Sequence, residues 1–178
     1  MRLSKTGYYA DFVVYPLLLV VLGWAAFRTT ASNQRWEGLL VFVAGVFLWT
    51  LLEYLLHRHI LHRLKPFKGL HDLHHARPTD LVGTPTWLSV SLFAGLALLL
   101  WGSTDAGLAG GLTAGLMLGY LWYVSVHHAV HHIKARSGSW LYRAKLRHAM
   151  HHQPGRPCNF GVTTGLWDVA FRSTRRSV

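Results

Sequence analysis

The chain has 178 residues, of which 51% are hydrophobic and only 14% are charged, whereas soluble domains carry roughly 25% charged residues. This balance excludes an ordinary soluble domain and predicts one membrane-embedded domain, residues 1–178. The formal net charge is +11. Because the basic residues flank apolar spans, we expect anionic lipid headgroups, and not nucleic acid, as their partner. A single cysteine, Cys158, excludes an internal disulfide.

Four apolar stretches approach the roughly 20 residues that a helix needs to cross a bilayer. They run roughly over residues 8–27, 37–56, 87–101 and 106–126. The third is short and joins the fourth through the tight connection 102–105, which predicts a helical hairpin that need not cross the whole hydrocarbon core. The first stretch follows Arg2 and Lys5 and could be a signal peptide, but its length and its terminal Tyr and Trp residues favour a retained helix.

Lysines and arginines predict the orientation of these helices. If the chain crosses the membrane four times, all Lys and Arg residues except Arg28 and Arg35 fall on one side, and that side is expected to be cytoplasmic. The C-terminus lies on the same side. The sequence therefore predicts an all-α integral membrane protein with four transmembrane helices and a cytoplasmic, histidine-rich helical cap.

Histidines are the most informative residues, because imidazole is the commonest metal ligand and is neutral near pH 7. The chain has 13, and none precedes His57. They follow the second and fourth apolar stretches in two groups. The first group is His57, His59, His62, His71, His74 and His75, and the second is His127, His128, His131, His132, His148, His151 and His152.

The spacing within each group is helical. Two triplets share the offsets i, i+3 and i+4, namely His71, His74 and His75, and then His148, His151 and His152. Such offsets place side chains on one helix face, where imidazoles can converge on a metal ion. His57 and His62 are five residues apart, so either they serve two different ions or the helix deforms there. For His59 we favour a helix-end or surface role.

Carboxylates are too few on the histidine side to supply the bridging ligands of soluble di-iron bundles, so the site must be nearly all imidazole. Glu53 lies one turn before His57, inside the end of an apolar stretch, where an ionisable group is costly and usually functional. Two roles are equally compatible with this position. Glu53 could accept the ring N–H of a ligating histidine, or it could pair with Arg58 or an arginine of the C-terminal part.

Four segments resemble, in order and in internal spacing, the histidine boxes of the fatty acid hydroxylase/sterol desaturase superfamily. They are residues 53–62, 71–75, 127–132 and 148–152. Residues 159–171 resemble the stretch that follows the last box. The lead from Leu118-Gly119-Tyr120 into Tyr123 and His127 is most similar to fatty acid 2-hydroxylases. The similarity is strongest over residues 53–171.

The resemblance implies an O₂-dependent, non-haem di-iron oxidoreductase that hydroxylates a membrane lipid, most readily a fatty acyl chain. The chain has no room for the cytochrome b5 domain often fused to such enzymes, so the resemblance also implies a separate electron-donor protein. Asp168 is assigned, with Glu53, to a supporting role beside the ligands. The metal ligands it implies are His57, His62, His71, His74, His75, His127, His131, His148, His151 and His152.

Iron suits this chemistry because zinc has no redox activity, although zinc could displace iron in purified material. Tyr120, Trp122 and Tyr123 are candidate walls for the acyl chain, with helix packing as the alternative. Residues 159–171 are too polar for a fifth span and are expected to fold back under the metal site. Basic residues that could hold an anionic headgroup, or simply flank the membrane, are Arg143, Lys145, Arg147 and Arg156.

Two other functions stay open at this point. A sterol or carotenoid hydroxylase or desaturase of the same superfamily would use the same chemistry on another lipid. A histidine-rich membrane protein that binds or transports metal belongs to a different class. Transport would require ionisable groups along a path through the membrane, and the interiors of the four apolar stretches are almost bare of them.

Overall fold

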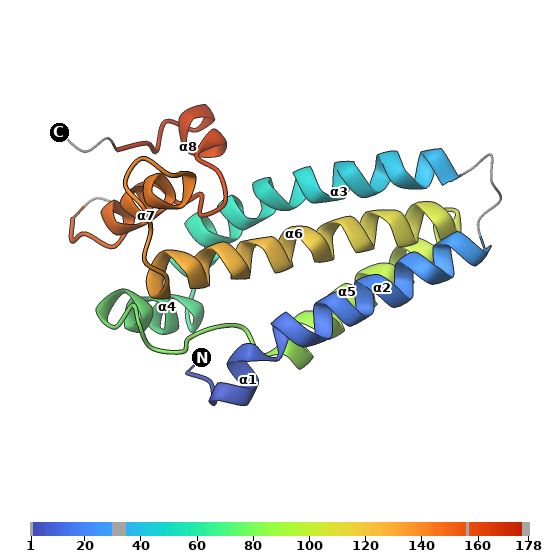
Figure 1. Cartoon of the computed structure of the whole chain (residues 1–178), viewed down its shortest axis with the longest axis horizontal. Helices are drawn as coiled ribbons and strands as arrows, with labels where there is room; N and C mark the ends of the chain where they lie inside the picture. Colours follow the sequence, from blue (N-terminus) through green and yellow to red (C-terminus); the bar gives the residue numbers. More distant parts are fainter. Residues whose placement is uncertain (1, 30–34, 156, 176–178) are drawn as a thin grey trace. The chain divides into compact units, whose positions relative to one another are not determined.

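The computed structural model describes residues 2–29, 35–155 and 157–175, and within these residues the fold is helical (Figure 1). No strand occurs in this part of the chain, apart from one isolated bridge between Arg2 and Val82. The elements are α1 (Lys5–Tyr9), α2 (Asp11–Thr29), α3 (Arg35–Leu55), the π-helix η1 (Leu56–Leu61), α4 (Phe67–Ala76), α5 (Thr86–Trp101), α6 (Ala106–His132), α7 (Trp140–His151) and α8 (Leu166–Ala170). The predicted all-α class is confirmed.

Three helical segments in the described residues are long and apolar enough to cross a membrane. They are Lys5–Arg28, Arg35–Leu61 and Ala106–His132. The fourth apolar helix, α5, has 16 residues and so spans about 24 Å at 1.5 Å per residue, which is less than the roughly 30 Å of a hydrocarbon core. Three of the predicted spans are thus confirmed by length and composition, and α5 is as short as its sequence indicates.

The chain divides into two compact units. Unit 1 comprises residues 1–49 and 81–121, and unit 2 comprises residues 50–80 and 122–178. The first part of α3 and of α6 lies in unit 1, and the last part of each lies in unit 2. Unit 1 therefore contains most of the apolar helical length, while every histidine of the chain belongs to unit 2.

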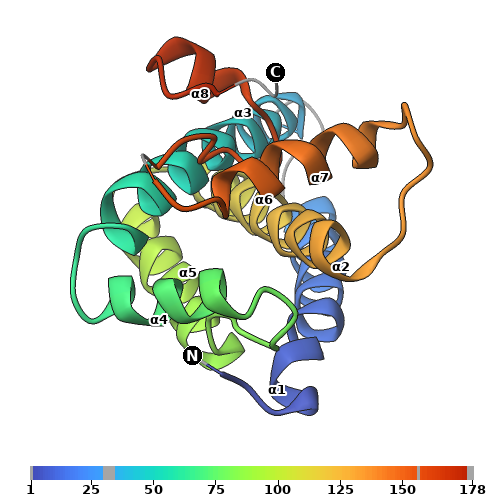
Figure 2. The same cartoon turned by 90° about the vertical axis from the view of Figure 1, so that its left-hand side faces the viewer.

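Unit 1 is a bundle of α2, α5 and parts of α3 and α6, which run side by side in Figures 1 and 2. Helices α3 and α6 pack backbone to backbone through glycine. A Cβ atom on Gly45 would lie 2.7 Å from the carbonyl oxygen of Leu112, and one on Gly111 would lie 2.7 Å from that of Gly38. Small residues commonly permit such close approach between helices in a membrane.

A polar cluster is buried inside unit 1. The carboxylate of Asp11, which is 6% exposed, accepts hydrogen bonds of 2.6 Å from the hydroxyls of Thr86 and Tyr120. The ring of Tyr120 packs against Tyr15 and Trp49, with centroids 4.9 Å and 5.4 Å away. Of the two roles considered for Tyr120, these contacts favour helix packing, because its hydroxyl and its ring faces are already engaged.

Helix α7 of unit 2 starts at a capping residue that is easily recognised in the sequence. Ser139 is the N-cap, and its hydroxyl oxygen accepts a 3.1 Å hydrogen bond from the backbone N–H of Tyr142. Such a cap satisfies one of the free amides at the start of a helix and stabilises it by about 1 kcal/mol. The capped helix carries His148, His151 and His152 in its last turn and just beyond.

Candidate metal centre

The π-helix η1 resolves the five-residue spacing between His57 and His62. The backbone N–H of His62 donates to the carbonyl oxygen of His57 over 3.3 Å, which is the i→i+5 bond of a π-turn. This wider turn brings both rings to the same side, with centroids 5.2 Å apart. The helix deforms, and the two histidines belong to one cluster instead of serving two ions.

The first cluster joins five imidazoles from η1, α4 and α7. It consists of His57, His62, His71, His75 and His151, each offering one ligand atom within 4.8 Å of the others. The Nε2 atom of His71 lies 3.0 Å from that of His57 and 3.1 Å from that of His62. The Nε2 atom of His75 lies 3.0 Å from those of His71 and His151. The Nε2 atoms therefore face one small volume.

The second cluster joins four imidazoles from α4, α6 and α7. It consists of His74, His131, His148 and His152, again within 4.8 Å of one another. The Nε2 atom of His148 lies 2.8 Å from that of His131 and 3.1 Å from that of His152. His127 lies beside this cluster, with its Nε2 atom 3.1 Å from that of His74. All ten histidines assigned as ligands thus gather in unit 2, nine of them inside the two clusters.

Besides His127, three histidines lie outside both clusters. They are His59, His128 and His132. The last two stack on each other along α6, with centroids 4.6 Å apart. The clusters themselves alternate along the helices, since α4 sends His71 and His75 to one and His74 to the other. One helical triplet is therefore divided between the two clusters, whereas its spacing indicates convergence at one point.

A segment that we call the strap, residues 158–165, orients two rings of the first cluster. The Nδ1 atom of His57 lies 2.6 Å from the carbonyl oxygen of Phe160, and the Nδ1 atom of His151 lies 2.7 Å from that of Cys158. The prediction that this part of the chain folds back onto the metal site is confirmed within unit 2.

These two bonds fix which nitrogen of each ring carries the proton. A carbonyl oxygen only accepts, so the hydrogen-bond network assigns the proton to Nδ1 in His57 and in His151. Their Nε2 atoms then present lone pairs to neighbouring imidazole nitrogens about 3 Å away. The Nε2 atom of His71 faces those of His57, His62 and His75 within 3.1 Å, and a single N–H can donate to only one of them, so a cation between the rings would satisfy the lone pairs that remain. The donor set therefore fits a bound metal ion, and neutral imidazoles suit iron(II) as well as zinc.

Asp168 holds the strap in place from behind. Its Oδ1 atom accepts from the backbone N–H of Phe160 and its Oδ2 atom from that of Gly161, both over 2.8 Å. The carboxylate is 1% exposed. A Cβ atom at Gly161 would overlap the carbonyl oxygen of Thr164, so only glycine fits this turn. Asp168 thus acts on His57 through one peptide unit and not by direct contact.

Glu53 also binds the strap and not a histidine ring, and it keeps a favourable charge interaction with Arg147 of the C-terminal part. Its Oε1 atom accepts from the backbone N–H groups of Val162 and Thr163, over 3.1 Å and 2.9 Å. It contacts no histidine ring, and Arg58 donates instead to the hydroxyl of Tyr54. The reason is physical: the strap turns inside the unit, its amides lack helical partners there, and a buried carboxylate supplies the acceptor.

Arg147 completes this support from α7. Its Nε atom donates to the carbonyl oxygen of Gly161 over 3.2 Å, and one terminal nitrogen donates to that of Val162 over 2.9 Å. Burial lowers the pKa of the guanidinium, while Asp168 and Glu53 oppose that shift. The expected headgroup role of Arg147 therefore competes with a structural one.

Burial keeps the imidazoles neutral. It is the largest cause in each case, and it lowers the pKa of His62 and of His75 from 6.5 to about 4. It also lowers the pKa of His71, His148 and His151, where neighbouring imidazoles add to the effect. Because a histidine must be unprotonated to bind metal, these shifts keep the ligands ready well below neutral pH.

The sequence also suggested residues for the wall of the acyl-chain site and for binding a headgroup. Trp122 is 53% exposed and stacks on Trp140 with centroids 5.8 Å apart. Tyr123 stacks on His127 at 5.8 Å, so it lies beside the second cluster. The amine of Lys145 donates to the carbonyl oxygen of Ile133 over 2.7 Å. Arg156 falls outside the described residues.

Sequence reasoning did not find the two backbone carbonyls that orient His57 and His151, nor the strap contacts of Arg147. Backbone acceptors leave no side-chain signature, so no pattern could have pointed to Cys158 or Phe160. The signal available in the sequence was Asp168, which was already assigned to a supporting role. Its Oδ1 atom also accepts a 2.7 Å hydrogen bond from the hydroxyl of Ser173.

Comparison with known proteins agrees with this geometry. A family model described as fatty acid hydroxylase matches residues 42–173. Fatty acid 2-hydroxylase of Rattus norvegicus is 33% identical over 96% of this chain and 53% of its own length. Dihydroceramide fatty acyl 2-hydroxylase FAH1 of Arabidopsis thaliana is 31% identical over 95% of this chain and 74% of its own length.

A solved structure described as full-length Scs7p, with only its hydroxylase domain visible, is also similar. It superposes with a TM-score of 0.82 at 28% identity, covering 97% of this chain and 68% of that one. The chain spans about half the length of mammalian relatives such as the rat protein, of which it covers 53%.

Proposed function

This chain belongs to the fatty acid hydroxylase family, and on that basis we propose that it hydroxylates the acyl chain of a membrane lipid, using O₂ and two iron ions. The names of its relatives point to carbon 2 of a fatty acid, free or within a ceramide. The observation that carries the proposal is the convergence of Nε2 atoms in two separate imidazole clusters.

The two clusters would hold one iron ion each. Their ligands would be the nine clustered histidines, with His127 beside His74 completing the ten. Iron bound there would supply the redox chemistry that activates O₂ for attack on an unactivated C–H bond, which zinc cannot do. The overall reaction consumes one O₂, two electrons and two protons, and yields the hydroxylated lipid and one water.

The chain's own residues would perform binding and positioning. The strap fixes the rings of His57 and His151 through their Nδ1–H groups, which keeps the Nε2 atoms free for the metal. Preorganised ligands avoid reorganisation during the reaction. Trp122 and Tyr123 remain candidates for the wall of the acyl-chain site, since both lie in unit 2.

We further propose that residues 1–178 form one catalytic domain with four transmembrane helices. In this arrangement the histidine clusters and the C-terminus face the cytoplasm, as the distribution of Lys and Arg predicts. The short helix α5 would cross only part of the core or be matched by local thinning of the bilayer.

The test is reconstitution. The purified protein is loaded with iron in lipid nanodiscs and supplied with a chemical reductant, a fatty acid or ceramide, and isotopically labelled O₂. We expect a product that carries one labelled oxygen atom on carbon 2, found by fragmentation in mass spectrometry. The double variant His74→Ala/His151→Ala is the control and should give none. A desaturated product, or the same product from the control, would contradict the proposal.

A further inference from the structure

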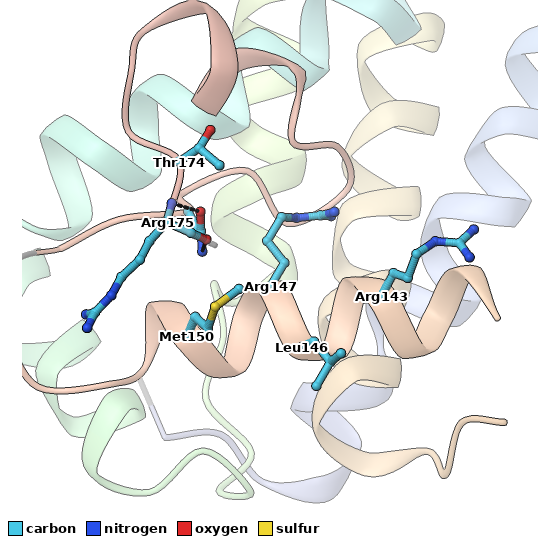
Figure 3. Close-up of a pocket in the computed structure, with 7 residues that line it drawn as sticks. Arg143, Leu146, Arg147, Met150, Thr174 and Arg175 are labelled. Carbon is cyan, nitrogen blue, oxygen red and sulfur yellow. Dashed lines mark hydrogen bonds between the residues drawn. The ribbon is translucent and has the colours of Figure 1, made fainter. Parts of the chain in front are cut away.

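An open groove lies on the outer face of α7 in unit 2, against the C-terminal segment 174–175 (Figure 3). Its volume is about 370 Å³. The lining residues are Arg143, Leu146, Arg147, Met150, Asn159, Thr174 and Arg175. Three of these carry a positive charge and none is acidic, so the groove favours an anionic partner.

The positive charges are spread along the groove and do not meet at one point. Figure 3 shows the side chains of Arg143 and Arg175 pointing away from each other, with Arg147 between them. Arg143 also donates to the carbonyl oxygen of Gly138 over 2.6 Å. A single phosphate or carboxylate needs guanidinium groups that converge on it, and this arrangement does not offer that. A row of charges matches an extended acidic surface better.

Apolar area lies between the charges. Leu146 is 42% exposed, and the half-buried side chain of Met150 lies one turn further along α7. An apolar centre with a charged rim is the usual composition of a protein-docking surface.

The groove also has short covalent connections to both histidine clusters. Arg147 precedes His148 of the second cluster, and Met150 precedes His151 of the first. Asn159 is bonded to Phe160, whose carbonyl oxygen contacts the ring of His57. A partner seated here would be separated from each cluster by a few bonds of α7 and the strap.

From these observations we propose that the groove docks an acidic one-electron carrier protein or domain. The inference rests on the proposed function, because hydroxylation consumes two electrons that an outside donor must supply. The carrier, an iron–sulfur or haem protein with an acidic surface, would bind twice per turnover and be oxidised by one electron each time. The matching protons and O₂ come from solvent, and one water is released.

The experiment measures docking separately from turnover. Iron-loaded protein in phosphatidylcholine nanodiscs is titrated with a fluorescently labelled plant-type [2Fe–2S] ferredoxin at increasing salt concentration. The test variant is R143E/R175E, which leaves the strap contacts of Arg147 intact. The matched control, K134E/R136E, makes the same change of charge at exposed residues that do not line the groove. Hydroxylation is assayed in parallel with reduced ferredoxin and with dithionite.

We expect wild-type binding to weaken as salt rises, since screening reduces charge steering. R143E/R175E should bind about tenfold more weakly, whereas the control should change less than about twofold. Turnover by the test variant should fall further with ferredoxin than with dithionite, because only the ferredoxin reaction depends on docking.

Three results would overturn the docking site: no binding by the wild type, equal losses in both variants, or unchanged ferredoxin binding by R143E/R175E. In the last case, weaker binding of that variant to vesicles containing phosphatidylserine would assign the groove to a lipid headgroup. Failure of the proposed function looks different. It would leave ferredoxin binding intact and give no product with either reductant.

Discussion

The two histidine clusters are similar in ligand type but differ in how their rings are held. In the first, the Nδ1 atoms of His57 and His151 bond strap carbonyls over 2.6 Å and 2.7 Å. In the second, the buried Nδ1 atoms of His74 and His148 have no hydrogen-bond partner among the described residues. One cluster is thus oriented by backbone, and the other by the packing of α4, α6 and α7.

This difference indicates which of the two clusters would bind its metal ion more tightly. Partners behind the ligands commonly change metal affinity by about 10- to 100-fold. The first cluster, with five imidazoles and two backbone contacts, should therefore retain its metal longer than the second. Both clusters depend on α7, because it supplies His151 to one and His148 and His152 to the other.

The largest expected effect comes from removing one ligand of either cluster. His151→Ala should abolish metal binding at the first cluster and His148→Ala at the second, so each variant should retain one ion of two. Turnover should fall by at least about a hundredfold in both, because loss of a ligand costs more than loss of its support. Metal content by elemental analysis checks the first expectation.

His59→Ala is the matched control, since this histidine lies outside both clusters. Its metal content and turnover should equal those of the wild type. If His148→Ala or His151→Ala kept two ions per chain, the division of the histidines into two sites would be wrong.

A smaller effect should follow from loosening the strap. Asp168→Asn places an amide where a carboxylate accepts from the N–H groups of Phe160 and Gly161. Metal affinity at the first cluster should drop about 10- to 100-fold while the second stays unchanged. Titration of the metal-free protein with iron(II) measures both affinities.

Glu37→Gln supplies the same change of charge at an exposed carboxylate of unit 1, far in sequence from every histidine. Exposed charges are screened by solvent and salt, so both affinities should stay within about twofold of wild type. Equal losses at the two clusters in Asp168→Asn would show general destabilisation and remove the positioning role of the strap.

The smallest effect concerns pH and the metal-free protein. The pKa values of His62 and His75 are about 4 when folded, below the ordinary 6.5. Between these values the unfolded chain binds more protons than the folded one, so stability is greatest above pH 6.5 and falls as pH drops toward 4. The unfolding temperature should decrease over this range, and less steeply in His62→Gln/His75→Gln. Parallel curves for the two proteins would contradict this assignment.

The sequence predicted most of what regular periodicity can reveal. Apolar length located three membrane-crossing helices and a shorter fourth, and helical offsets identified the triplets of α4 and α7. The resemblance to a family separated His59, His128 and His132 from the other histidines. These features depend on spacing along one helix, which a sequence displays directly.

Features that depend on backbone geometry could not be predicted. The acceptors for His57 and His151 are carbonyl groups, which every residue carries. Glu53 binds amides that lack partners only because the strap turns where it does. The hydroxyl of Tyr120 bonds Asp11 from a distant part of the chain. In each case tertiary structure, and not local pattern, decides the contact.

The π-turn η1 has a consequence for how this segment can vary. Removing one residue between His57 and His62 would leave an i, i+4 pair, which an ordinary α-helix already holds on one face. Adding one residue would instead turn His62 by about 100° away from His57. Homologues and engineered versions should therefore tolerate a one-residue deletion here, with an α-helix in place of the π-turn, but not an insertion.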